Sequence, residues 1–251
     1  VLINSLKEKT DIIRNPLSLI GDNGIVFTNF INAAEKMNFF NALANSLFVT
    51  VTSTLLIVLF SSMAAYIITR KNWIACRALF VLMILSLAIP FQVLMIPLVA
   101  IYGGIFHILN HRMTLIFMHI GFCVSMSCFL FCGNIRATIP LELEEAASID
   151  GCGPFQTFRK IVFPLLKPTI ATTIIINALN IWNDYLLPSL ILTDTKLQTL
   201  PIATRVFYGA FSADLGLLMA ALVLMVVPIL VLYLFLQKHI IDGVVAGAVK
   251  G

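Results

Sequence analysis

Residues 139–168 read IPLELEEAASIDGCGPFQTFRKIVFPLLKP, a polar stretch that lies between long apolar runs. Its first half predicts a short helix, because Pro140 suits a first helical position and the acids that follow lie where the helix dipole favours anions. Asp150 and Gly151 predict the end of that helix, since glycine readily adopts the left-handed conformation of a C-cap. The chain restarts at Pro154, so we expect a helix–turn–helix unit on a membrane surface.

The second helix of this unit is predicted from apolar residues that recur on one helical face. They are Phe155, Phe158, Ile161 and Val162. Pro164 and Pro168 are expected to end the unit. In the first helix, Ala146 and Ala147 stand beside acidic residues. Small side chains let a helix enter a groove on another protein while the acids meet basic partners; a solvated surface helix is the alternative.

The composition is that of a membrane protein. Of the 251 residues, 60% are hydrophobic and only 11% are charged, and the mean hydropathy is +1.00. A soluble domain carries about 25% charged residues. From this composition the lipid bilayer is the expected partner. The formal net charge of +4 is small and spread over the loops, so no nucleic-acid surface is predicted.

Five apolar runs are long enough to cross a bilayer, which takes about 20 residues. They lie at 42–69, 78–102, 114–133, 169–192 and 217–236. The second run contains Pro90 and Pro97, which predict a kinked or broken helix. We therefore predict an all-α polytopic helical bundle with a single membrane domain over residues 1–251.

Basic residues indicate which way the bundle faces. Arg70, Lys71 and Arg77 make a dense basic turn on the same side as the 139–168 unit. Because basic loops favour the cytoplasmic face, this unit is predicted to be cytoplasmic. Five spans put the chain ends on opposite faces, so we expect one further span before residue 1, six in all.

Motifs for catalysis are absent from the sequence: it contains no nucleotide-binding loop, serine-hydrolase elbow or metalloprotease helix. The chain is therefore expected not to be an enzyme, and any ATP hydrolysis must come from another chain. His107 and His111 have a spacing that can bind a metal on a helix. Neither a cysteine nor a carboxylate adjoins them, so no metal site is predicted.

Asp184 is the one acid placed at membrane depth, where a charge is costly and normally faces a cavity or a partner. Asn180 and Asn183 could hydrogen-bond sugar hydroxyls, and Trp182 could stack on a pyranose ring. These four residues are candidates for a substrate pathway. The alternative is that the polar groups hold helices together or interrupt the span.

The 139–168 unit resembles the EAA loop of permease subunits of bacterial ABC importers. The matching residues are, in chain order, Glu145, Ala146, Ala147, Asp150, Gly151, Ile161, Pro164 and Pro168. Cys152 and Gly153 stand where Ala or Ser is more usual. The resemblance implies that the loop couples to a cleft in a separate ATPase. That ATPase would bind ATP and magnesium, whereas this chain would bind no cofactor.

Residues 180–194, NIWNDYLLPSLILTD, resemble the fifth-helix segment of carbohydrate ABC permeases of the maltose type, and the tail AGAVKG resembles their C-terminus. The resemblance implies import of a carbohydrate, such as an oligosaccharide, across the bacterial cytoplasmic membrane. The implied partners are a second permease subunit, a pair of ATPase subunits and an extracytoplasmic sugar-binding protein. Lys250 and Gly251 are expected to contact the ATPase.

Three other classes are weighed against this interpretation. The first is an ABC permease for another solute, such as a polyamine; a cationic substrate would need more intramembrane acids than Asp184 alone. A secondary transporter or channel would need coupling carboxylates or a pore ring, and it leaves the 139–168 unit unexplained. A membrane enzyme would need a cluster of catalytic groups that the sequence does not contain.

Overall fold

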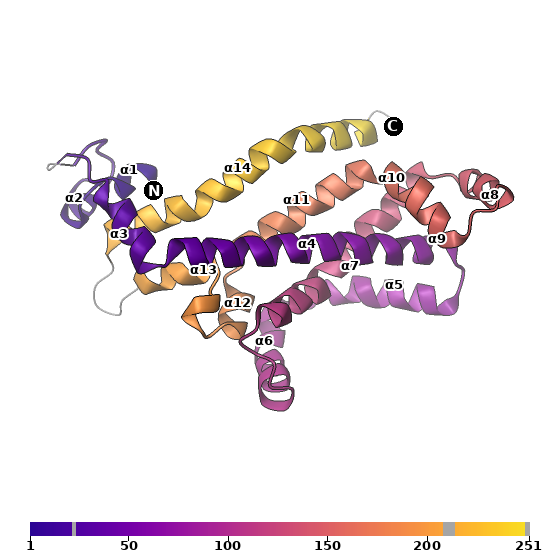
Figure 1. Ribbon diagram of the computed structural model, residues 1–251, viewed down its shortest axis with the longest axis horizontal. Coiled ribbons are helices and arrows are strands. Elements are labelled where there is room, and N and C mark those ends of the chain that lie inside the picture. The colour runs from indigo at the N-terminus through magenta and orange to yellow at the C-terminus, as the bar shows by residue number, and fades with distance from the viewer. Residues whose placement is uncertain (22–23, 208–213, 249–251) are drawn as a thin grey trace.

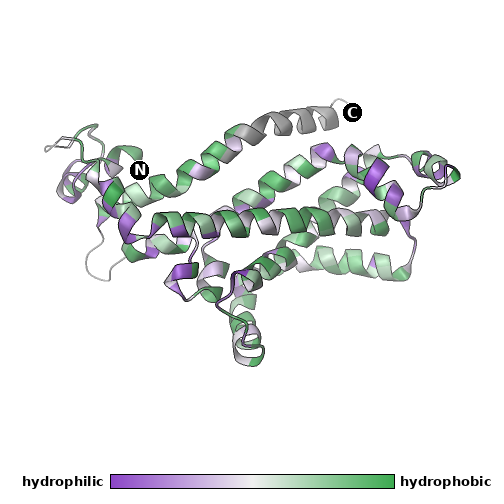
Figure 2. Cartoon of the chain, viewed as in Figure 1, coloured by the Kyte–Doolittle hydropathy of each residue, from purple (hydrophilic) through white to green (hydrophobic). Residues whose placement is uncertain are grey.

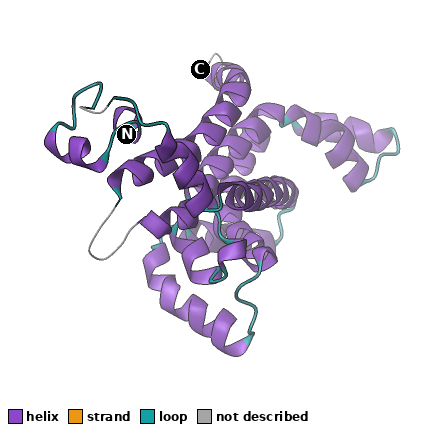
Figure 3. Cartoon of the chain, turned by 60° about the vertical axis from the view of Figure 1, so that its left-hand side comes forward, coloured by secondary structure: helices purple, strands orange, loops and turns teal. Residues whose placement is uncertain are grey.

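The computed structural model describes residues 1–21, 24–207 and 214–248, and this part of the chain folds into helices without a β-strand (Figures 1 and 3). Long helices lie along one another in an elongated bundle, and short helices gather at its two ends (Figure 1). Within the described residues, the predicted all-α bundle is therefore confirmed.

Two helices are long and apolar enough to cross a membrane by themselves. They are α4 (Phe39–Arg70) and α7 (Arg112–Thr138). They correspond to the predicted runs at 42–69 and 114–133, and they pack side by side along the bundle (Figure 1). Each begins or ends at an arginine, because the charged head reaches water at the end of an apolar run.

The second predicted run is broken, as its prolines indicate. Helix α5 (Ile74–Ser86) stops before Pro90, and α6 (Phe91–Val99) with the π-helical turn η1 (Ala100–Ile105) continues at an angle of 100°. Pro90 cannot donate a backbone hydrogen bond and disfavours helical geometry in the residue before it. As a result α6 points away from the long axis of the bundle (Figure 1).

The fourth predicted run, 169–192, is not one helix. Helix α11 (Lys167–Asn183) ends where Asp184 takes an extended conformation, and the short helix α12 (Leu186–Ile191) follows. The Asp184 carboxylate accepts from the Leu187 N–H at 3.4 Å, so this side chain caps the helix that follows the break.

The last predicted run, 217–236, falls on α14 (Leu215–Ala248), in which Leu215–Val231 is a shorter apolar helix. Among the described residues, two helices pass as spans, and up to four do if each bent pair counts as one. Three short helices pack against the beginning of α14 at one end of the bundle: α1 (Leu2–Ser5), α2 (Lys9–Arg14) and α3 (Thr28–Lys36).

The remaining elements between α12 and α14 are short. They are η3 (Thr195–Leu197), α13 (Leu200–Ala203) and η4 (Thr204–Phe207). Figure 2 shows apolar residues along the whole bundle and hydrophilic ones concentrated at its two ends. That distribution is expected when the middle of a helical bundle lies in hydrocarbon and its ends lie in water.

Candidate functional site

The first half of the 139–168 unit forms helix α8 (Leu141–Ile149), at the end of the bundle away from α1–α3 (Figure 1). Pro140 is its N-cap and not its first helical residue, so the helix begins one residue later than predicted. The predicted stop is confirmed: Gly151 has φ +83°, and the Cys152 N–H donates to the Ala147 carbonyl at 2.9 Å. Only glycine adopts this left-handed conformation without steric cost.

Glu144 anchors α8 to the end of α4. The Arg70 Nε lies 2.7 Å from the Glu144 carboxylate, and the Tyr66 hydroxyl donates to the second carboxylate oxygen at 2.9 Å. A second Arg70 nitrogen donates to the Ile139 carbonyl at 2.8 Å. Both charged side chains are mostly buried, with 15% and 10% exposed. Sequence reasoning missed this contact because its two partners lie far apart in the chain.

The predicted coupling residues of α8 divide between two faces. Ala147 is buried against the bundle, whereas Glu145 and Ala146 are exposed. With Glu142 and Ile149 they recur at helical spacing, and Ile149 is 86% exposed. This outward face, defined by Glu142, Glu145, Ala146 and Ile149, combines acids with an exposed apolar side chain. Asp150 and Gly151 are also exposed, directly after it.

The second helix of the unit ends in the predicted region. It consists of α9 (Pro154–Thr157), η2 (Phe158–Val162) and α10 (Phe163–Leu165), and the chain then bends by 76° into α11, between Pro164 and Pro168. Pro164 lies in the first turn of α10 and Pro168 in the first turn of α11. A missing N–H is tolerated in a first turn, so these prolines begin helices here.

The apolar face predicted for the second helix is only partly buried. Phe158 and Val162 pack into the core formed with α4 and α7, Ile161 is half-buried, and Phe155 is exposed. Glu144 thus ties the first half of the unit to α4, and Phe158 and Val162 tie the second half to α4 and α7.

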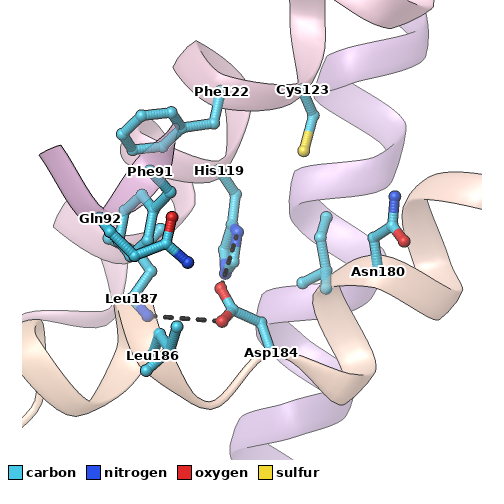
Figure 4. Close-up of a pocket in the computed structure, with 10 residues that line it drawn as sticks. Phe91, Gln92, His119, Phe122, Cys123, Asn180, Asp184, Leu186 and Leu187 are labelled. Carbon is cyan, nitrogen blue, oxygen red and sulfur yellow. Dashed lines mark hydrogen bonds and ion pairs between the residues drawn. The ribbon is translucent and has the colours of Figure 1, made fainter. Parts of the chain in front are cut away.

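A half-open cavity of about 330 Å³ lies where four helices meet (Figure 4). Its lining comes from α6, α7, α11 and α12, and from Asp184 between α11 and α12. The lining residues are Phe91, Gln92, His119, Phe122, Cys123, Asn180, Ile181, Asp184, Leu186 and Leu187. The cavity is therefore built around the break before α6 and the break after α11.

His119 and Asp184 point toward one another in this cavity (Figure 4). The His119 Nδ1 lies 3.9 Å from one Asp184 carboxylate oxygen, and the Leu187 N–H donates to the other at 3.4 Å. His119 is only 3% exposed, and its Nε2 has no hydrogen-bond partner among the described residues. Sequence reasoning did not identify His119 or Gln92, because each stands alone in an apolar run.

The four predicted substrate-pathway residues are not all brought together. Asn180 and Asp184 line the cavity. Trp182 does not: it is 2% exposed, and its indole N–H donates to the Met225 carbonyl at 3.1 Å, which packs α11 against α14. Asn183 is exposed and donates to a carbonyl one turn earlier in its own helix. The indole ring is thus not available for stacking on a sugar.

The predicted tail contact at Lys250 and Gly251 lies outside the described residues.

An apolar helical bundle that holds a partly polar cavity and presents an acidic helix at one end has the features of a membrane transport subunit. The family model described as binding-protein-dependent transport system inner membrane component matches residues 57–245. The chain belongs to this family.

Two relatives cover the whole chain. One is the probable starch degradation products transport system permease protein AmyC of Thermoanaerobacterium thermosulfurigenes, which is 38% identical over 100% of this chain and 89% of its own. The other is the melibiose/raffinose/stachyose import permease protein MelC of Bacillus subtilis, 39% identical over 100% and 90%.

A solved structure shares the fold. It is a chain of a bacterial ABC transporter involved in the import of the acidic polysaccharide alginate, which matches with a TM-score of 0.76 over 94% of this chain and 87% of the other. The sequence identity is 19%, so this likeness concerns the fold alone.

Proposed function

We propose that this chain is a permease subunit of an ATP-driven ABC importer that moves an oligosaccharide across the bacterial cytoplasmic membrane. The observation that carries the proposal is full-length similarity, at 38% and 39% identity, to permeases named for starch degradation products and for melibiose, raffinose and stachyose. The chain crosses the membrane several times, and it leaves ATP hydrolysis to another subunit.

The 139–168 unit is the proposed coupling element. Its outward face would lie in a cleft of a cytoplasmic ATPase, which binds ATP and magnesium, with Asp150 and Gly151 beside it. An exposed Ile149 among acids supports docking to a protein surface better than contact with water. Because Glu144 is held by Arg70 at 2.7 Å, a shift of α8 would move the end of α4 with it. Ile161 and Pro164 belong to the half of the unit that passes this motion to α11.

The other proposed partners are a second permease subunit, a pair of ATPase subunits and an extracytoplasmic sugar-binding protein. A solved structure with the same fold is a bacterial alginate ABC transporter in complex with an alginate pentasaccharide-bound periplasmic protein, which supports the binding protein as a partner. The substrate path would pass the cavity at Asn180 and Asp184. Lys250 and Gly251 remain proposed contacts of the ATPase.

The test is reconstitution of the permease with its ATPase and binding protein in proteoliposomes, followed by measurement of ATP-dependent uptake of maltotriose and raffinose. Glu145→Lys places a cation on the outward face of α8, and we expect co-purification of the ATPase and uptake to be lost while membrane insertion is unchanged. Glu35→Lys is the control, because Glu35 is exposed on α3 at the other end of the bundle; the ATPase should still co-purify. Normal uptake by Glu145→Lys would contradict the coupling role.

A further inference from the structure

The cavity of about 330 Å³ combines two kinds of surface. Phe91 and Phe122 form an aromatic pair with ring centroids 5.3 Å apart and planes at 85°. Gln92, His119 and Asp184 provide polar atoms beside them (Figure 4). A site that offers both an apolar surface and a few oriented polar groups is typical of small-molecule recognition.

His119 sets the position of the acid in the cavity. Its Nδ1 faces Asp184 at 3.9 Å, and its Nε2 is buried out of reach of solvent, with no partner among the described residues. The groups that a ligand can reach are therefore on other side chains. Gln92 and Asn180 are exposed to the cavity and can both donate and accept hydrogen bonds.

The size of the cavity limits what it can hold. Sites for small molecules measure about 300–1,000 Å³, so a half-open cavity of 330 Å³ holds one sugar ring, and further rings of an oligosaccharide would extend outside it. The helix breaks before α6 and after α11 form this cavity. At membrane depth, backbone that is not helical is tolerated only if it lines a cavity or is buried in protein, which fits both breaks.

The charge of the cavity selects among sugars. Asp184 is its acidic side chain, and no Lys or Arg is among the described residues that line it. A uronate ring would bring a second carboxylate next to Asp184 with no Lys or Arg to pair it, and two neighbouring carboxylates repel each other. A neutral ring meets hydrogen-bonding, aromatic and aliphatic side chains and adds no charge.

We propose that this cavity binds one neutral pyranose ring of the transported oligosaccharide and excludes uronate rings. Asp184, Gln92 and Asn180 contact its hydroxyl groups, and Phe91 and Phe122 pack on the ring, while His119 holds Asp184 in place. The proposal rests on the proposed import of oligosaccharides. It assigns this subunit a selectivity of its own, separate from that of the binding protein.

The experiment uses the complete transporter in lipid nanodiscs without the binding protein, so that only the membrane subunits can select the ligand. Binding of maltotriose, raffinose and digalacturonate at millimolar concentration is measured by saturation-transfer NMR. We expect signal from one ring of a neutral oligosaccharide and none from digalacturonate. Gln92→Leu and Asp184→Asn should weaken binding of the neutral ligand at least tenfold, and Asp184→Asn should let digalacturonate bind.

Thr172→Ala is the matched control, because Thr172 lies on α11 outside the cavity and its hydroxyl bonds only to a carbonyl one turn earlier; its binding should equal the wild type. Equal binding of maltotriose and digalacturonate to the wild type, or unchanged binding in both cavity variants, would overturn the proposal. ATP-dependent uptake with the binding protein is measured in parallel. If sugar uptake persists while the NMR prediction fails, the ring-binding proposal is wrong and the proposed import function is unaffected. If no sugar is taken up, both the import function and the ring-binding proposal are wrong.

Discussion

At the scale of single residues, the Arg70–Glu144 contact is the joint between the acidic helix and the bundle. Arg70 donates both to the Glu144 carboxylate and to the Ile139 carbonyl. Its planar guanidinium can satisfy both acceptors together, which the single ammonium of a lysine cannot do in the same geometry. Hydrogen bonds to charged groups contribute roughly 1.5–3 kcal/mol each, so this residue pair is a sensitive test of coupling.

We expect Arg70→Lys to reduce ATP-dependent uptake by about tenfold or more, because a loss of 1.4 kcal/mol corresponds to a factor of ten. Arg136→Lys is the matched control, since Arg136 lies at the same end of the bundle and its guanidinium stacks over Phe80 instead. Uptake and co-purification of the ATPase are measured for both. Equal activity of the two variants would mean that α8 is held by its other contacts.

Gly151 gives a second prediction at this scale. A Cβ at this position would meet no atom within 4 Å, so its φ of +83° is the sole obstacle to a larger residue. A left-handed conformation costs roughly 1–2 kcal/mol for most residues, and asparagine tolerates it best. Gly151→Val should therefore lower uptake strongly, Gly151→Asn only slightly.

Gly153 provides the control for that series. It too has open space around a Cβ, but its φ is −72°, so Gly153→Ala should behave as the wild type in the same uptake assay. If Gly151→Val were as active as Gly153→Ala, the turn after α8 would not need its left-handed residue.

At the scale of elements, α7 and α11 are joined by a buried polar contact. The Asn177 side chain donates to the Ser127 hydroxyl at 3.0 Å and to the Thr173 carbonyl at 2.8 Å. Such contacts between membrane helices are worth about 0.6 kcal/mol on average, with a maximum near 1.7. Asn177, a polar residue within the fourth apolar run, thus has a structural role between two helices.

We expect Asn177→Ala to destabilise the protein by about 1 kcal/mol, measured as a lower midpoint of thermal unfolding in detergent. Asn183→Ala is the comparison, because Asn183 is exposed and bonds only within its own helix; its midpoint should change little. An unchanged midpoint for Asn177→Ala would show that apolar packing alone holds α7 to α11.

Long elements could be predicted from the sequence, and contacts between them could not. The apolar runs of α4 and α7 are long enough by themselves to predict membrane-spanning helices. Pro90 predicts a break because a proline ring disturbs the helix at its own position. The end of α11 was misjudged, since the apolar residues of α12 extend the hydropathy beyond Asp184. The partner of Glu144 could not be found, because hydropathy and spacing carry no information on which distant residues meet.

The cavity shows the same limit more sharply. Asn180 and Asp184 could be predicted as candidates because polar residues are unusual in an apolar run. Trp182 has the right chemistry for a sugar, but its helical position turns it toward α14. The aromatic surface comes from Phe91 and Phe122, which in sequence are indistinguishable from other apolar residues of a membrane helix.

At the scale of the whole molecule, the bundle is longer than the hydrocarbon layer of a membrane is thick. Helix α4 has 32 residues, which at 1.5 Å per residue gives about 48 Å, compared with about 30 Å of hydrocarbon. The helices α1–α3 lie at one end and α8 lies at the other (Figure 1). Hydrophilic residues gather at both ends (Figure 2), so we expect each end to face its own aqueous compartment.

The final prediction is the orientation of these ends in intact cells. Ile13 on α2 is 64% exposed and Ile149 on α8 is 86% exposed, so a cysteine at either position reacts with a membrane-impermeant maleimide wherever the reagent reaches it. In a background with the five native cysteines replaced by serine or alanine, we expect Ile13→Cys to be labelled from outside and Ile149→Cys only after permeabilisation. The basic turn at Arg70 and Lys71 lies at the α8 end, which is the physical reason to place that end in the cytoplasm. Labelling of Ile149→Cys in intact cells would put α8 out of reach of any cytoplasmic ATPase and would end the coupling proposal, whatever the sugars transported.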